Sequence, residues 1–442
     1  MNATLLFYLS AYAFGLWKAF VSRPVWGVYV YFLCFYMHAP SQWWGKSLPE
    51  FRWAMVASLV TIVAIILNTP RRGFRFFGFR ENWLLIALFL LVSIQTPFAL
   101  VPEFHKEYVF LLFKFIMFIF IVQNTVWTAK DLERVIWVNL FGGAYLAYMG
   151  MSMHTGGRLE GIGTPGMESA NQLGQQFAVL IFAGGYLLLQ KFRLSHVFVS
   201  IALCFILMAL FMTESRGVLA AMAVTGLLAA IFIPQGKRGK VATFGALSIV
   251  AASLLMGPQI IARFQGVEQD NLGEMKDASA QSRVVIIKSQ WEMSKSSPVF
   301  GHGHRGTLIL SPDYIDEKYF AHGTGHRASH NVVMAFLVDH GFVGLGIYLI
   351  LIVTCAWRIW LIKRPVDLLP EKMQQEFVFL SSLKVGCTLA LVCFFLSGMG
   401  SNNKKLEGDI WMFAFIPLVS ARMHRIVRKQ ERLEEMEVKE SL

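Results

Sequence analysis

Long apolar stretches, separated by short polar loops, run along almost the whole chain of 442 residues. Most of them approach the roughly 20 apolar residues that a helix needs to cross a bilayer. They are 4–20, 25–38, 53–67, 83–100, 108–127, 134–151, 172–189, 196–213, 217–233, 241–256, 331–362, 377–397 and 409–421. The first, second and last are short enough to be tilted, re-entrant or interfacial. The pattern predicts an all-α polytopic membrane protein with about 12–13 transmembrane helices.

One long polar interval interrupts this pattern, and it divides the chain into four parts. We expect a single bundle rather than separable soluble domains, with the polar interval partly helical. The parts are an N-terminal transmembrane bundle (1–256), the polar loop (257–330), C-terminal transmembrane helices (331–421) and a mixed-charge cytoplasmic tail, either a helix or solvated and partly disordered (422–442).

Composition supports the membrane interpretation. The chain is 55% hydrophobic and only 15% charged, whereas a soluble protein carries about 25% charged residues. The net charge of +12 does not indicate a nucleic-acid partner, because much of the basic excess lies in short loops between spans. The five cysteines all lie in apolar runs, so neither a disulfide framework nor a cysteine metal site is predicted.

The distribution of Lys and Arg predicts the orientation, since cytoplasmic loops are enriched in both. The basic loops fall on one side if the spans alternate, and that side is then cytoplasmic. In a bacterium the opposite side is the periplasmic face of the inner membrane. The number of spans, 12 or 13, leaves the side of the N-terminus open. The loops assigned to the outer side are 39–52, 101–107, 152–171, 213–216, 257–330 and 398–408.

Arg216 stands between a span that is apolar through Met212 and another that begins at Val218. A guanidinium at a membrane boundary is costly unless it has an anionic partner or reaches water. Arg216 is therefore either an interfacial anchor paired with Glu214 or a phosphate ligand, because the planar guanidinium binds phosphate oxygens bidentately.

Two residues of the polar loop are further candidates. Arg283 lies near the start of a predicted helix over 282–296, which can lie along the membrane surface with Trp291 at the interface. This arginine is either solvated or bound to an anion. His330 stands where the loop meets the next apolar segment. It is either a capping or interfacial residue, or a general base, since histidine is easily tuned to act near neutral pH.

The loop also holds histidines whose spacing resembles that of metal ligands. His302 and His304 are one pair, and His322 and His326 are another. Two glycines separate the second pair, and neither a cysteine nor an HExxH motif accompanies it. We therefore predict neither a metal site nor a cofactor. Arg305 and Arg327, in the same loop, remain secondary candidates for binding an anion, as do His322 and His326 for proton transfer.

Three motifs follow one another in a fixed order. They are Thr213-Glu214-Ser215-Arg216-Gly217; then Ser282-Arg283 with Pro298-Val299-Phe300-Gly301-His302-Gly303; then Ser329-His330-Asn331 with Asp339-His340-Gly341. With the many spans and the large late loop, this order resembles the O-antigen ligase superfamily, which includes O-antigen polymerases and protein O-oligosaccharyltransferases. The likeness is clear over about 205–350. The loop also resembles that of exosortase-associated O-glycosylation ligases.

The resemblance implies a GT-C-like membrane glycosyltransferase, and the absence of a metal motif predicts that its reaction needs no metal. Its donor would be a glycan on a polyprenyl diphosphate, and its acceptor lipid A-core, the choice we favour, or another glycan or a protein. By resemblance, Arg216 and Arg283 would hold the diphosphate and His330 would activate the acceptor. Two arginines could stabilise a diphosphate leaving group in place of a metal.

Functions of another class remain open. A transporter or flippase for a lipid-linked substrate would use intramembrane charges such as Lys114 and Lys384, although the chain shows no inverted repeat. A non-catalytic scaffold of a surface-glycan machine is a third hypothesis. Only an enzyme would change the covalent partner of the glycan.

Overall fold

The computed structural model describes most of the chain. The predicted span 241–256, the first part of the polar loop and His322 lie largely or wholly outside the described residues. The described residues are 3–49, 51–68, 74–162, 166–189, 193–232, 238–239, 241, 278–320, 325–360, 369–401 and 407–441.

In these residues the regular elements are all helices, as the hydrophobic pattern predicts. Nine of the described helices are long and apolar enough to cross a membrane, and α3 and α9 are shorter apolar helices. The all-α polytopic membrane fold is therefore confirmed. The main helices are α1 (Ala3–Val21), α2 (Val25–Met37), α3 (Trp53–Asn68), α4 (Arg80–Gln95), α5 (Pro102–Thr125), α6 (Ala129–Met153), α7 (Ala170–Gly185), α8 (Ser195–Met212), α9 (Arg216–Phe232), α11 (Ala278–Lys295), α12 (Gly306–Tyr314), α13 (Val332–Trp357), α14 (Glu371–Gly398) and α15 (Gly408–Ser441).

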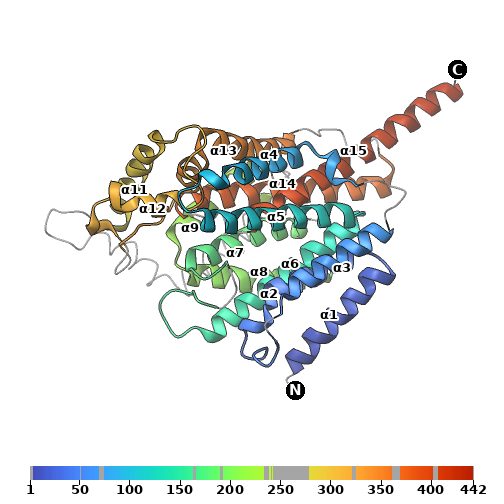
Figure 1. The fold of residues 1–442 in the computed structure, drawn as a ribbon. Coiled ribbons are helices and arrows are strands. Elements are labelled where there is room, and N and C mark those ends of the chain that lie inside the picture. The colour runs from blue at the N-terminus through green and yellow to red at the C-terminus, as the bar shows by residue number, and fades with distance from the viewer. Residues whose placement is uncertain are drawn as a thin grey trace.

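Helix α14 lies in the middle of the bundle, packed against α7, α9, α13 and α15 (Figure 1). Buried apolar side chains from α2 to α9 and from α13 to α15 form one continuous core around it. Helices α1, α2 and α3 enclose a smaller core centred on Tyr8 and Cys34 at the edge of the bundle. The N-terminal and C-terminal spans thus share one core, as expected of a single bundle.

The polar loop folds over one end of this bundle. Helices α11 and α12 lie there, while α15 projects from the other end, so the charged tail is helical (Figure 1). Leu100 donates a backbone hydrogen bond to the His302 carbonyl (3.0 Å), and Leu159 donates one to Met212 (2.8 Å). Segments near the ends of four loops that the charge pattern assigns to one side therefore make two contacts with one another.

The polar loop packs against a kink in α13. Gly341 has a φ of 64° and a ψ of −170° inside the helix, a conformation that glycine adopts readily. The chain before α12 crosses at this point, and His302 donates a backbone hydrogen bond to the Val338 carbonyl (2.9 Å). A Cβ on Gly341 would lie 2.2 Å from the Val299 carbonyl oxygen, so this close crossing requires glycine.

Side chains on both sides of the kink complete the joint. The Gln95 amide in α4 donates to the Asp339 carbonyl (2.6 Å), and its oxygen lies 2.8 Å from His340 Nδ1. The Asp339 carboxylate accepts the backbone N–H of Gly306 (2.9 Å) at the start of α12, where a negative charge is favourable. The Asp339-His340-Gly341 motif thus has a structural role: it fixes α12 to α13.

Candidate functional site

The Ser329-His330-Asn331 junction is held from two sides. Asn331 is the N-cap of α13, since its side chain accepts the Met334 N–H (3.0 Å) and satisfies a donor that the helix leaves free. The other end of the same side chain donates to the Met399 carbonyl (3.1 Å), after α14. Ser329 accepts a hydrogen bond from Gln290 of α11 (2.8 Å). His330 lies half-buried between these two anchored residues.

Arg283 reaches the same end of α14 from the first turns of α11. A Cβ built on Gly400 would lie 3.9 Å from Arg283 Nη1 and 3.9 Å from the Cα of Gly217. Gly217 is the neighbour of Arg216, so the arginine of α11 and the start of α9 meet across the end of α14. The structure therefore brings together segments that are more than sixty residues apart in the sequence.

Arg216 is the first residue of α9 and follows a tight turn. Glu214 in this turn has a φ of 45°, which is uncommon for a residue other than glycine. The start of α9 places the positive end of the helix dipole beside the guanidinium. Charge and helix end together favour an anion at this point.

Arg158 holds this turn in place. The sequence alone did not predict its role. Arg158 donates to the Thr213 carbonyl (3.1 Å) and to the Asn171 side-chain oxygen (3.0 Å). Ser215 donates to the same Asn171 oxygen (2.7 Å). The sequence feature that could have identified Arg158 is its position in loop 152–171, which the charge pattern assigns to the same side as Arg216.

The electrostatics of the junction are dominated by like charges. Burial, followed by the charges of Arg327 and Arg283, lowers the pKa of His330 to about 4. Burial and the charge of Arg283 also lower the pKa of Arg327. No carboxylate among the described residues forms an ion pair with either arginine. A buried anion would relieve this repulsion.

Arg327 has an additional sign of an unmet partner. Its Nε is buried and has no hydrogen-bond acceptor among the described residues. A buried N–H of a charged group without an acceptor is costly. The sequence ranked Arg327 only as a secondary candidate, and the structure gives it the same surroundings as Arg283 and His330.

The other secondary candidates lie elsewhere or outside the described residues. The Arg305 guanidinium lies over the Phe104 ring (4.4 Å) and 3.8 Å from the Glu107 carboxylate, at the start of α5. His326 is exposed. His322 lies outside the described residues.

The remaining loop histidines contribute to packing. His302 Nε2 lies 3.0 Å from the Met293 carbonyl oxygen and 3.0 Å from Ser296 Oγ. His304 stacks on Tyr108 with ring centroids 4.4 Å apart. Within the described part of the chain, no three His, Cys, Asp or Glu side chains are placed to share a metal ion. The expectation of a metal-free reaction stays a prediction.

Comparison with known proteins gives one family. Residues 199–349 match the family model of O-antigen ligases. This match confirms the resemblance to the O-antigen ligase superfamily that the motifs predict, and it includes Arg216, Arg283 and His330. No curated protein matches the chain.

Proposed function

We propose that the protein is a membrane glycosyltransferase that transfers O-antigen or a related oligosaccharide from a polyprenyl diphosphate to an acceptor. The family match supports the general class, a membrane ligase or polymerase of glycans with a lipid-linked donor. The observation that carries the proposal is the meeting of Arg283, Arg327, His330 and the start of α9 at one end of an apolar bundle.

The arginines suit the diphosphate of the donor. Guanidinium groups bind phosphate oxygens through paired charge-assisted hydrogen bonds. When the bond from the anomeric carbon to the diphosphate oxygen breaks, the diphosphate leaves with the electron pair. Arg216 and Arg283 stabilise that developing charge. Arg327 joins them, because its buried Nε has no described acceptor. The polyprenyl chain lies against the apolar helices.

His330 is proposed as the base. The hydroxyl of the acceptor attacks the anomeric carbon, and its proton passes to His330. With a pKa of about 4, the free histidine is neutral at physiological pH and able to accept a proton. A bound diphosphate neutralises Arg283 and Arg327, two of the three causes of the low pKa. The histidine therefore becomes a stronger base when the donor is present.

We infer that the site faces the periplasm from the inner membrane of a bacterium. The support is the basic-loop pattern together with the contacts that gather the predicted outer loops at one end of the bundle. Lipid A-core is the acceptor we favour, because the loop and the Ser329-His330-Asn331 junction most resemble the ligase branch. A growing glycan or a protein hydroxyl offers the same nucleophile.

The test uses purified protein in detergent or vesicles, with lipid-linked O-antigen and lipid A-core and with EDTA present. The proposal predicts that glycan becomes covalently attached to lipid A-core and that free polyprenyl diphosphate accumulates. Joining of two lipid-linked glycans would indicate a polymerase instead. A glycan that only crosses the vesicle membrane, still attached to its carrier, would contradict the proposal and indicate a transporter.

A further inference from the structure

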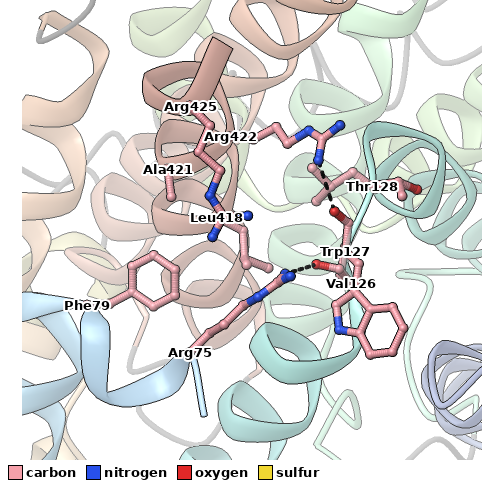
Figure 2. Close-up of a pocket in the computed structure, with 10 residues that line it drawn as sticks. Arg75, Phe79, Val126, Trp127, Thr128, Leu418, Ala421, Arg422 and Arg425 are labelled. Carbon is pink, nitrogen blue, oxygen red and sulfur yellow. Dashed lines mark hydrogen bonds between the residues drawn. The ribbon is translucent and has the colours of Figure 1, made fainter. Parts of the chain in front are cut away.

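A second basic site lies at the end of the bundle opposite to His330. Helix α5 begins at Pro102, close to the hydrogen bond between Leu100 and His302, and ends at Thr125. At about 1.5 Å per residue, the helix is about 36 Å long. Just beyond Thr125, the linker from α5 to α6 and one face of α15 line a hollow that is open to solvent and measures about 330 Å³ with the open space included (Figure 2). Three arginines line it, namely Arg75, Arg422 and Arg425.

Two of these arginines are oriented by the backbone of the linker. Arg75 donates to the Val126 carbonyl (3.3 Å), and Arg422 donates to the Trp127 carbonyl (3.2 Å), as the dashed lines in Figure 2 show. Each bond uses one N–H of a guanidinium that carries five. The carbonyls thereby hold the guanidiniums in place at the wall of the hollow.

The positive charge of the hollow is only partly compensated. Arg422 pairs with Glu376 on α14 (2.6 Å). Arg425 is exposed and forms no ion pair with a carboxylate of the described residues. The nearby Asp131 carboxylate is already engaged by Arg23. The hollow is therefore suited to an anion.

The remaining walls are apolar. Phe79, Leu132 and Leu418 line the hollow together with the arginines. Phe74 and Phe77, on the segment that carries Arg75, are 45% and 52% exposed, so this segment also presents apolar surface. A ligand that fits this hollow combines a phosphate with apolar groups.

We propose that this hollow binds a phosphate-bearing anion and that its source is the headgroup of an anionic phospholipid. Soluble phosphate shares the charge but would leave the apolar walls in contact with water. Basic pockets between transmembrane helices are suited to such headgroups. The bound lipid joins α15 to the linker from α5 to α6. This site is independent of the proposed glycan transfer.

The experiment compares thermal unfolding of the purified full chain in nonionic detergent with phosphatidylglycerol, phosphatidylcholine or inorganic phosphate. For the wild type we expect phosphatidylglycerol to raise the Tm by about 2–4 °C and the other two additives to leave it unchanged. Arg425→Gln should lose this rise, because it removes a guanidinium without breaking a described contact. Arg428→Gln is the matched control, since this exposed arginine on the same helix does not line the hollow.

Two results would overturn the assignment. An equal rise with phosphatidylglycerol in wild type and Arg425→Gln would remove the site from this hollow. The same rise with inorganic phosphate alone would show that soluble phosphate, rather than a lipid, is the ligand. Because Arg425 is exposed, we expect the variant to fold, and its Tm without additive verifies this.

Discussion

Arginines at the two ends of the bundle differ in whether they pair with a carboxylate. At the end away from His330, Arg23 pairs with Asp131, Arg358 with Glu81 and Arg422 with Glu376. At the other end, Arg283 and Arg327 lie near each other and His330, and no described carboxylate pairs with them. Arg23 and Arg358, each paired with a buried carboxylate, have structural roles. For Arg283 and Arg327, which lack such a partner among the described residues, we propose an anionic ligand.

The largest expected effect is at His330. His330→Ala should lower turnover by about 10²–10⁴-fold, the usual contribution of a general base. The measurement is glycan transfer by purified variants in single-turnover assays. His326→Ala is the matched control, because this exposed histidine lies in the same loop and should keep nearly full activity. Wild-type turnover in a folded His330→Ala variant would refute the assignment of the base.

The arginines at the same end should follow. Arg283→Lys and Arg327→Lys keep the charge but lose the planar fork. Each should lower turnover by about 10²–10³-fold, as for other contacts to a developing negative charge. Arg305→Lys is the comparison, since this side chain lies over Phe104, and we expect a change of less than about threefold. Unchanged turnover in Arg283→Lys and Arg327→Lys would show that charge alone matters. Equal losses in all three variants would show that the effect is not specific to this site.

An ion pair at the opposite end should behave in the reverse way. Arg23→Ala leaves the buried Asp131 carboxylate without its bidentate partner. We expect a loss of about 1–3 kcal/mol in the free energy of unfolding, with turnover per folded molecule unchanged. Unfolding in detergent and the transfer assay measure these separately. Lost turnover in a stably folded Arg23→Ala variant would mean that the two ends are not functionally distinct.

The pH dependence should sharpen the comparison with the smallest effect. The pKa of an unfolded histidine is 6.5, whereas the pKa of folded His330 is about 4. As the pH falls between these values, the unfolded chain binds a proton that the folded protein does not, so folding stability decreases. The acidic limb of the pH profile of kcat/KM reports the pKa of His330 in the free enzyme. The acidic limb of kcat reports the pKa of His330 in the complex with the donor. We expect the limb of kcat at the higher pH, because bound diphosphate screens Arg283 and Arg327. Coinciding limbs would contradict this coupling.

The sequence predicts the helices well because each apolar run has to satisfy its own backbone in the membrane. It also gives Arg216, Arg283 and His330 as candidates, since their motifs are local. It does not predict the role of Arg158, because hydrophobic patterning does not specify which outer loop contacts the turn before α9. It gives Arg327 only as a secondary candidate, because the burial of its Nε is a property of the folded structure.

The predicted helix of the loop illustrates the same limit. Its existence follows from spacing alone, and α11 spans Ala278–Lys295. The side chains that pack inward are Ile286, Gln290 and Met293, whereas Trp291 is 45% exposed. The buried Gln290 side chain donates hydrogen bonds to Thr307 and Ser329. Residues distant in sequence therefore determine which face of the helix is buried.

The most direct test of the central claim is binding of a polyprenyl diphosphate analogue to Arg283→Lys and His330→Ala, measured side by side with wild type. If the arginine holds the diphosphate and the histidine acts only on the acceptor, Arg283→Lys should raise the Kd at least about tenfold, equivalent to about 1.4 kcal/mol. His330→Ala should leave the Kd within about twofold. Unchanged binding in the folded Arg283→Lys variant would contradict the account.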